Sequence, residues 1–515
     1  MKKQLLFLGL LGLATQARAQ SPWTLVNYPN SNILTQYNIN DIHTLSPTVA
    51  WGVTSDKVAT GAPAAIPNTF IRTNNAAGDE FDFNSVTLTT DGAVPTAHSA
   101  TLGNISGVSD LIAVAAAYPG STFVQPTNGS PAYGGEIRKT TDGGTTWLNK
   151  TVGKFVGDGS FCNWVHMFNA TTGVALGDPT GKTATNPGVF EILRTVDGGE
   201  TWNRLTAGVP APLLAEYGNA GAFYASTSTP GTLWTGLASA NSTDQVRVFK
   251  TTDFGLTWTA SAIIPNIIGS ISQLTFKSNN LDGIAYGYVI TGSGSSATVT
   301  GINYARTSDG GLTWSPFTPV NTATGSFFRN AIDAVGNTYY STGPRYPVPT
   351  TGQVPEDFGF SSSTDGINWT NITVSGSNLN NPGYFFCMDL IAGTAPNSVV
   401  GYGGLYTDVN GLGGVYKYSR TTLATRNAAL QSALNVYPNP SANGQFSIDL
   451  GSELKAGAQL TVSDALGRQV KSQTLNAATV GSRKVNLDLS GEKTGVYTLQ
   501  IRTDAGLATQ KIVID

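Results

Sequence analysis

One turn-forming stretch occurs five times in this chain at an almost constant spacing. The first copy, residues 140–147, reads Thr-Thr-Asp-Gly-Gly-Thr-Thr-Trp. It returns at residues 195–202, 251–258 and 307–314, and a form one residue shorter occupies residues 363–369. Successive aspartates of these copies lie 55 or 56 residues apart. A fixed period of this length indicates a repeat architecture, in which each repeat forms one structural unit.

The residue types of each copy predict a tight turn between two strands. Asp accepts backbone N–H groups a few residues on, Gly adopts a positive φ, and the Thr-Trp pair favours a new strand. The indole ring is also large enough to fill a gap between neighbouring sheets. We therefore expect the aspartates and tryptophans to be structural rather than catalytic or metal-binding. They are Asp142, Trp147, Asp197, Trp202, Asp253, Trp258, Asp309, Trp314, Asp365 and Trp369.

The pattern Ser/Thr-x-Asp-x-Gly-x-Thr-Trp resembles the Asp-box repeat, also called the BNR repeat. The resemblance implies a β-propeller, because this repeat is found in sialidases, in some other glycoside hydrolases and in non-enzymatic secreted propellers. In that family the box lies on the face opposite the active site. The resemblance therefore implies a fold and leaves the function open.

The strand patterns between residue 21 and about residue 420 predict seven repeats rather than five. The repeats begin near Asn38, Ala97, Trp164, Ala222, Gln273, Phe327 and Tyr384. The first repeat carries a degenerate turn, residues 73–81, and the seventh has no turn after its third strand, residues 414–418. Residues 21–26 resemble the strand that follows each turn. We therefore predict an all-β fold over residues 20–420, a seven-bladed β-propeller closed by its N-terminal strand.

Composition and the N-terminus predict an exported protein. The chain holds 60 glycines, only 12% charged residues and a net charge of −3, and it shows no basic patch that would suit nucleic acid. Residues 1–19 predict a signal peptide, in which Lys2 and Lys3 precede an apolar run too short to cross a bilayer. Cleavage is expected between Ala19 and Gln20. We expect no transmembrane segment in the mature chain.

A linker, residues 421–434, and a second domain, residues 435–515, are predicted to follow. The alternating strands of this domain predict a small β-sandwich. It resembles the type A C-terminal sorting domain of the type IX secretion system in three places: the Tyr-Pro-Asn-Pro start at 437–440, the turn at 464–468 and the strand beginning at Gly495. This resemblance implies the type IX machinery as a partner. It also implies delivery to the outer surface or the medium, and removal of the tail.

Ligand contacts are predicted on the face opposite the turns, where the connections are long and differ from repeat to repeat. The longest span residues 119–135 and 343–358. Aromatic faces beside amide and hydroxyl groups suit sugars or peptides, although the same residues would equally stiffen a secreted loop. The candidate ligand-binding residues are Tyr118, Tyr133, Tyr217 and Tyr346.

Two functions remain open from the sequence. The leading hypothesis is a secreted or cell-surface binding or scaffold module for an extracellular glycan or protein. The alternative is a glycoside hydrolase, sialidase-like or acting on another polysaccharide, with catalytic carboxylates on the loop face; no catalytic residue can be assigned. A sialidase is disfavoured because its Arg-Ile-Pro signature is absent, the nearest segment being residues 70–73. Several arginines recur before the turns as part of the repeat: Arg138, Arg194, Arg247 and Arg306.

The histidines and cysteines are few. His43, His98 and His166 fall near the first strands of three neighbouring repeats and could meet at a metal, but we expect satisfied core histidines instead. Cys162 and Cys387 belong to repeats far apart round the predicted ring, so we expect free buried thiols. We predict no metal and no cofactor, because the chain has no phosphate-binding Gly loop and no supported Ser-His-Asp or Cys-His set.

Overall fold

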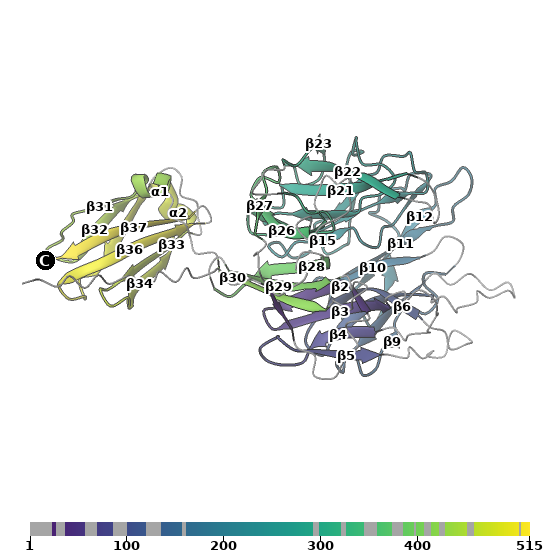
Figure 1. The fold of residues 1–515 in the computed structure, drawn as a ribbon, viewed down its shortest axis with the longest axis horizontal. Helices are drawn as coiled ribbons and strands as arrows, with labels where there is room; N and C mark the ends of the chain where they lie inside the picture. The colour runs from purple at the N-terminus through teal and green to yellow at the C-terminus, as the bar shows by residue number, and fades with distance from the viewer. Residues whose placement is uncertain are drawn as a thin grey trace, which may run out of the picture.

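The computed structural model of the chain describes residues 23–26, 37–56, 69–85, 100–119, 135–156, 161–291, 298–320, 326–344, 358–372, 385–395, 398–405, 414–421, 428–450, 458–503 and 506–515. Within these ranges the protein is all-β, with two short helices in its C-terminal part. The described strands from residue 23 to residue 421 form seven four-stranded antiparallel sheets and one two-stranded sheet (Figure 1).

Six of these sheets follow the order of the chain. The first contains β2 (Tyr37–Ser46), β3 (Val49–Asp56), β4 (Thr69–Thr73) and β5 (Phe81–Ser85), and the second contains β6 (Ala100–Gly107), β7 (Ala113–Pro119), β8 (Glu136–Thr140) and β9 (Leu148–Asn149). The third contains β10 (Cys162–Met167), β11 (Gly173–Thr180), β12 (Val189–Thr195) and β13 (Asn203–Arg204). The fourth contains β15 (Phe223–Ala225), β16 (Leu233–Gly236), β18 (Val248–Thr251) and β19 (Thr259–Ala260). The fifth contains β20 (Gln273–Phe276), β21 (Gly283–Thr291), β22 (Thr298–Thr307) and β23 (Ser315–Phe317), and the sixth contains β24 (Ala331–Val335), β25 (Thr338–Pro344), β26 (Phe358–Ser363) and β27 (Thr370–Asn371).

The seventh sheet combines strands from distant parts of the chain. It contains β28 (Phe385–Ala392), β29 (Ser398–Leu405), β30 (Val415–Thr421) and the N-terminal strand β1 (Trp23–Leu25). β1 is antiparallel to β30, with Trp23 opposite Tyr418 and Leu25 opposite Tyr416. The N-terminal strand thus takes the fourth position in a sheet whose third strand is not followed by the repeated turn.

The repeated turn connects the third and fourth strands of five sheets, and its aspartate holds it together. In the copy between β12 and β13, Asp197 accepts the Thr195 hydroxyl at 2.7 Å, the Thr201 N–H at 3.0 Å and the Thr201 hydroxyl at 2.6 Å. Gly199, with a φ of 84°, donates its N–H to the Thr195 hydroxyl at 2.9 Å. The Thr201 hydrogen bonds lower the pKa of Asp197 to about 2. The carboxylate is therefore engaged within its own turn.

The tryptophan of each turn packs between two sheets. Trp147 of the second sheet is buried and lies edge-on to Phe70 of the first, with ring centroids 5.4 Å apart. In the degenerate turn of the first sheet, Phe81 takes this place and lies 5.3 Å from Tyr402 of the seventh. Trp23 packs against the sixth sheet in the same way. An aromatic ring therefore fills this position even where the turn has changed.

The hydrophobic core between residues 23 and 421 is divided among the gaps between consecutive sheets. Seven clusters of buried residues each combine side chains from two sheets that follow one another, within the described residues. One of them joins the seventh sheet to the first, where Ile39 and Ile42 share a cluster with Cys387 and Val415. Burial of apolar surface therefore links each sheet to its two neighbours.

Basic residues next to the turns add a second link between sheets. Arg194, directly before the turn of the third sheet, donates to the carbonyl of Phe254 in the next turn at 2.8 Å. Lys250 donates in the same way to Gly310 at 3.1 Å, and Lys139 forms an ion pair with the turn of the third sheet. The recurrence of a basic residue at this position therefore has a structural cause.

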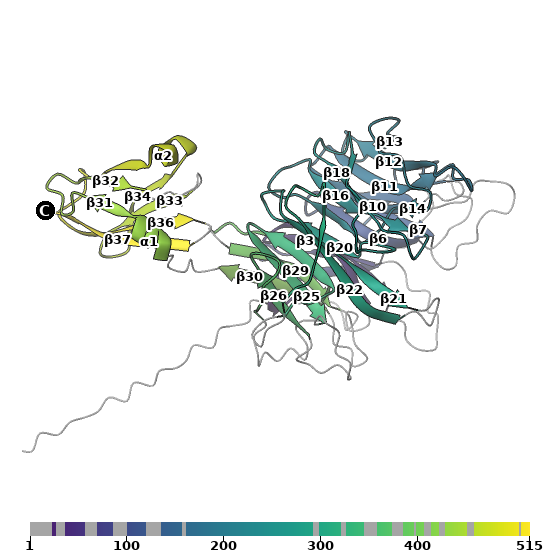
Figure 2. The same cartoon turned by 90° about the horizontal axis from the view of Figure 1, so that it is seen from above.

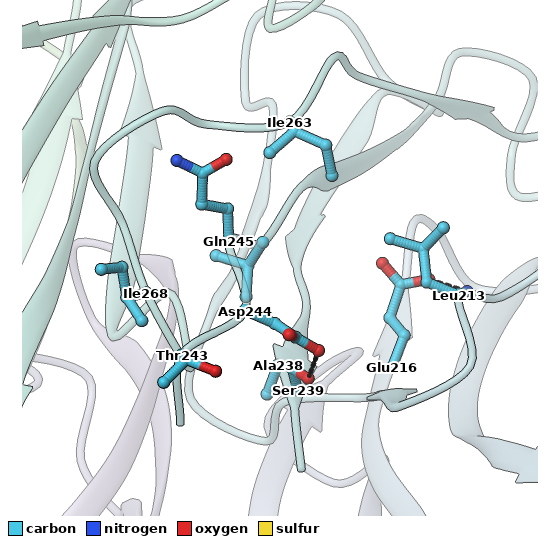
Figure 3. Close-up of a pocket in the computed structure, with 10 residues that line it drawn as sticks. Leu213, Glu216, Ala238, Ser239, Thr243, Asp244, Gln245, Ile263 and Ile268 are labelled. Atoms are coloured by element: carbon cyan, nitrogen blue, oxygen red, sulfur yellow. Dashed lines mark hydrogen bonds between the residues drawn. The ribbon is translucent and has the colours of Figure 1, made fainter. Parts of the chain in front are cut away.

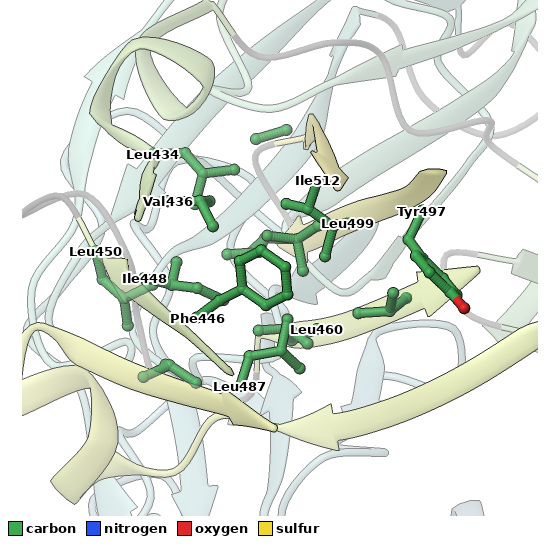
Figure 4. Packing of buried hydrophobic residues seen from close by; sticks show 14 of the residues in the cluster. Leu434, Val436, Phe446, Ile448, Leu450, Leu460, Leu487, Tyr497, Leu499 and Ile512 are labelled. Atoms are coloured by element: carbon green, nitrogen blue, oxygen red, sulfur yellow. The ribbon is translucent and has the colours of Figure 1, made fainter. Parts of the chain in front are cut away.

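The C-terminal strands form two sheets around one core, apart from the other sheets in Figures 1 and 2. One sheet contains β31 (Asn435–Tyr437), β32 (Gln445–Asp449) and β35 (Lys484–Asp488), and the other contains β33 (Gln459–Ser463), β34 (Gln469–Thr474), β36 (Gly495–Thr503) and β37 (Gly506–Ile514). A short helix, α2 (Ala477–Ser482), precedes β35. Phe446, Leu460 and Leu499 lie between the sheets (Figure 4).

The predicted linker contains a helix that packs on this C-terminal unit. Helix α1 spans Ala428–Ala433, and Leu430 and Leu434 belong to the same core. The side-chain oxygen of Gln431 accepts the N–H of Thr509 at 2.9 Å. Residues 428–434 are therefore part of the packed C-terminal unit.

Both cysteines are buried and free, as the sequence predicts. Burial raises the pKa of both thiols well above the ordinary value, and the Cys387 Sγ lies 3.4 Å from the carbonyl of Ile39. In the part of the chain that the structure describes, neither helix has the length and apolar character needed to cross a membrane.

Candidate functional site

The connections of each sheet fall at two opposite ends, because antiparallel neighbours reverse the chain at every connection. One end, the turn end, carries the first-to-second connections and the repeated turns. In the second sheet the two are joined by a hydrogen bond from the Gly143 N–H to the Leu111 carbonyl at 2.9 Å. The other end, the loop end, carries the second-to-third connections and the segments that lead to the next sheet.

A pocket of about 440 Å³ lies at the loop end of the fourth sheet (Figure 3). Its walls come from the segment before β15, from the connection between β16 and β18, and from the segment between β19 and β20. This volume falls in the range of small-ligand sites. The lining residues are Leu213, Glu216, Ala238, Ser239, Thr243, Asp244, Gln245, Val246, Ile263 and Ile268.

Backbone hydrogen bonds hold these three segments together. The two-stranded sheet pairs β14 (Glu216–Tyr217) with β17 (Ala238–Ser239), and an isolated bridge pairs Gln245 with Ile268. The carbonyl of Gly269 accepts the Ser239 N–H at 2.7 Å, and the Gly269 N–H donates to the Asp244 carbonyl at 2.8 Å. The pocket therefore has walls fixed to one another, as a preformed site requires.

The carboxylate of Glu216 is fully engaged by protein groups. Arg247 donates to it twice, from Nε to Oε1 at 2.8 Å and from Nη2 to Oε2 at 2.7 Å. The Leu213 N–H donates to Oε2 at 3.0 Å, and the Glu216 side chain is only 4% exposed. A buried bidentate pair of this kind holds the carboxylate in one orientation. Glu216 therefore supports the pocket wall, and both of its carboxylate oxygens are occupied by protein donors.

Unlike Glu216, Asp244 has one carboxylate oxygen that accepts no hydrogen bond from a described residue. Its Oδ2 accepts the hydroxyl of Ser239 at 2.8 Å and the amide of Asn241 at 3.2 Å (Figure 3 shows the first contact). Among the described residues, none donates a hydrogen bond to Oδ1 and none forms an ion pair with Asp244. One carboxylate oxygen of the pocket is therefore available to a ligand.

The rest of the pocket is mostly aliphatic. Leu213, Ile263 and Ile268 are 44%, 38% and 43% exposed, whereas Val246 is buried. The described residues that line the pocket include no aromatic side chain. Exposed aliphatic residues that gather at a pocket are typical of sites that contact apolar parts of a partner.

Of the predicted ligand-binding tyrosines, Tyr118 packs against other protein groups and Tyr217 lies beside the pocket. Tyr118 stacks on Phe161 with ring centroids 4.5 Å apart, and its hydroxyl donates to the Asn163 carbonyl at 3.0 Å. Its ring and its hydroxyl are thus both in contact with protein. Tyr217 lies half-buried in β14, next to the pocket residue Glu216. Tyr133 and Tyr346 lie outside the described residues.

Two of the three histidines lie close together on first strands. The rings of His43 and His166 are 5.8 Å apart, and Nδ1 of His43 accepts the Gly107 N–H at 2.8 Å. Burial lowers the pKa of His43 to about 4 and that of His166 to about 3, so both are neutral at pH 7. His98 lies outside the described residues. Within the described ranges, His, Cys, Asp and Glu form no group of three or more that could hold a metal ion.

Three aspartates on the first strands each bind the backbone of the next sheet. Burial raises the pKa of Asp41 to about 6, and it also raises the pKa values of Asp333 and Asp389. The three contacts are from Ile105 N–H to Asp41 at 2.8 Å, from Leu390 N–H to Asp333 at 2.6 Å, and from Thr44 N–H to Asp389 at 2.5 Å. The last contact joins the seventh sheet to the first.

Neither these aspartates nor the pocket was identified from the sequence. The signal for the first set is an Asp at the centre of an otherwise apolar first strand, as in Ala-Ile-Asp-Ala-Val at 331–335. The signal for the pocket is the pair of aliphatic residues in two sheet-to-sheet segments, 213–214 and 267–268. Aromatic residues in the connections point to neither, because the aspartates lie within strands and the pocket lining is aliphatic.

Residues 435–515 match the family model of the secretion system C-terminal sorting domain. This tail indicates that the type IX secretion machinery exports the chain, and that the protein is placed on the cell surface or in the medium. No curated protein matches the chain in sequence.

Several solved structures resemble the chain at low sequence identity. YCF48 bound to D1 peptide is 14% identical, with a TM-score of 0.41, and the match covers 80% of this chain and 100% of that one. The GH74 xyloglucanase of Xanthomonas campestris is 11% identical with a TM-score of 0.44, covering 95% and 74%. The Hadza microbial sialidase Hz136 is 13% identical with a TM-score of 0.39, covering 70% and 74%. Similarity this low carries no inference about activity.

Proposed function

We propose that residues 20–420 form a seven-bladed β-propeller closed by the N-terminal strand, and that this propeller is an extracellular binding module. Residues 1–19 are its signal peptide, residues 421–434 connect it to the tail, and residues 435–515 direct its export. The closed ring is supported by the seven inter-sheet clusters and by the pairing of β1 with β30. In a closed ring, every sheet would pack against a neighbouring sheet on both sides.

The loop-end pocket is the observation that carries a binding function. It combines fixed walls, exposed aliphatic side chains and one carboxylate oxygen without a described partner. Hydrolysis at this pocket is disfavoured, because a glycoside hydrolase needs two carboxyl groups able to take part in the reaction. Glu216 is held by Arg247, so Asp244 would act alone.

A glycoside hydrolase remains the second candidate, because two buried aspartates, Asp41 and Asp389, lie close enough that, besides burial, the charge of Asp41 raises the pKa of Asp389. The pKa of Asp41, about 6, lies in the range that suits a general acid near neutral pH. Under this alternative, turnover of a polysaccharide would disappear in Asp41→Asn and persist in Asp244→Asn.

The binding function is tested with a pair of matched variants. The purified full chain is applied to arrays of extracellular glycans and peptides, together with Ile268→Glu at the pocket and Leu256→Glu at the turn end. Both side chains are exposed aliphatics, 43% and 50% exposed, so either change should be tolerated by the fold. We expect Ile268→Glu to abolish binding and Leu256→Glu to preserve it. Binding that is lost only in Leu256→Glu would place the site at the turn end and contradict the proposal.

A further inference from the structure

The loop-end pocket has a chemistry that narrows the class of its ligand. Its exposed surface is aliphatic, from Leu213, Ile263 and Ile268 around the buried Val246. Sugar rings are commonly held against aromatic faces, which the described lining does not offer. Branched aliphatic side chains instead match aliphatic groups of a partner, such as Leu, Ile or Val in a peptide.

The charge of the pocket is negative on balance. The carboxylate of Glu216 is neutralised by Arg247, whose guanidinium is bound to it at 2.7 and 2.8 Å. Lys182, the other nearby cation, donates its ammonium to the Glu216 carbonyl at 2.6 Å. Asp244 has no cationic partner among the described residues. The pocket therefore favours a positively charged group beside an apolar one.

We propose that the pocket binds a protein segment in which an aliphatic side chain lies next to a lysine or arginine. The aliphatic side chain packs among Leu213, Ile263 and Ile268, and the basic group pairs with the carboxylate of Asp244. The neighbouring Gln245 and Thr243 supply polar groups for the backbone of such a segment. This inference rests on the binding function proposed above and specifies its ligand.

Immobilised peptide libraries test the inference with the full chain. One library contains a fixed Leu-Lys pair, a second a fixed Leu-Glu pair and a third a fixed Ser-Lys pair, each within random neutral residues. The expected result is retention by Leu-Lys, and weaker retention by the other two. Higher NaCl concentration should reduce the difference between Leu-Lys and Leu-Glu, because the ion pair is partly exposed to solvent.

Two substitutions separate charge from shape. Asp244→Asn keeps an oxygen for Ser239 and removes the charge, so affinity for Leu-Lys peptides should fall about five- to tenfold. Asp244→Lys should turn the preference toward Leu-Glu. Asp110→Asn, which removes an exposed carboxylate at the turn end, is the matched control and should change nothing.

The outcomes distinguish this inference from the function on which it rests. Retention of glycans or neutral peptides that is lost in Ile268→Glu but unchanged in Asp244→Asn would overturn the proposed ligand and leave the binding function standing. Equal retention of all three libraries would do the same. A chain that retains no probe, or whose retention is insensitive to Ile268→Glu, would overturn both.

Discussion

The two ends of the sheets are built on opposite principles. At the turn end, the same residues recur in five sheets, and each has a partner inside the protein: Asp197 binds Thr201, and Arg194 binds the next turn. At the loop end, the segments differ from sheet to sheet, and Asp244 keeps an oxygen without a described partner beside exposed aliphatic residues. Repetition therefore marks residues that hold the sheets together, whereas variation marks the surface where a ligand can be recognised.

We expect the turn end and the loop end to belong to one unit that folds without the C-terminal tail. Deleting residues 435–515 is expected to abolish delivery and leave the protein in the periplasm, because the tail carries the sorting signal. The retained protein should melt like the intact one, and its ligand binding should be unchanged. Cell fractionation and thermal unfolding measure the two effects. Normal surface delivery of the truncated chain would contradict the sorting role.

Loss of the contacts of β1 should destabilise both ends together. Trp23→Ala removes a buried ring that contacts the sixth sheet and Tyr418, and it should lower the free energy of unfolding by about 3–5 kcal/mol. Chemical denaturation measures the loss. Leu25→Ala, on the exposed side of the same strand, is the control and should cost little. Equal stability of both variants would mean that β1 does not close the ring.

The first strands lie between the two ends, and their buried aspartates should make the stability of the packed sheets sensitive to pH. Protonation of Asp41 favours the folded state, because its pKa is raised from 3.8 to about 6. This contribution is complete below about pH 4 and is lost as the pH rises through about 6. We compare the free energy of unfolding of Asp41→Asn with that of the wild type. The difference in favour of the variant should be about 1–3 kcal/mol larger at pH 8 than at pH 4.5.

Thermal unfolding of both proteins at the two pH values gives this difference. His43 and His166 act in the opposite direction below their ordinary pKa, and Asp389, Cys387 and Tyr118 also lie near Asp41. They are present in both proteins, so the comparison isolates Asp41. Parallel pH profiles would show that the carboxyl group does not titrate in this range.

A carboxylate should have different roles at the two ends. Asp197→Ala at the turn end should cost about 1–2 kcal/mol of stability, because it removes the hydrogen bonds of one turn, with no change in ligand affinity. Asp244→Ala at the loop end should lower affinity with a smaller loss of stability. Calorimetric melting and binding measured on the same samples test the contrast. Loss of binding in Asp197→Ala with stability intact would reverse the assignment of the ends.

The ion pairs of the turn end should contribute least. Lys139→Met removes the 2.5 Å contact with Glu200, whose side chain is 49% exposed. Lys139 itself is buried, but Glu200 is half-exposed and keeps Lys150 as a partner, so the loss should be about 1 kcal/mol or less and the melting temperature should change only slightly. A larger loss than in Asp197→Ala would mean that links between turns outweigh the hydrogen bonds within them.

The sequence predicted the features that repeat along the chain. It did not predict features that form only where distant segments meet in the folded protein. The five turns and the pairing of residues 23–25 with 416–418 follow from patterns in the sequence, because one residue type recurs for one geometric reason. Tyr118 illustrates the limit: the sequence makes it a candidate ligand contact, and only the structure shows that its ring stacks on Phe161. The pocket depends on three segments that meet only after the sheets are packed. The aliphatic pairs at 213–214 and 267–268 mark two of these segments but do not predict that they meet.

The pairing of β1 with β30 also limits when the seventh sheet can be completed during synthesis. Trp23 meets Tyr418 across roughly 400 residues of chain, so the contact cannot form until the chain has been synthesised as far as β30. Until then Phe360 and Phe385 lack the indole ring that packs on them in the folded protein. The seventh sheet can therefore be completed only after the strands of the other six have been made.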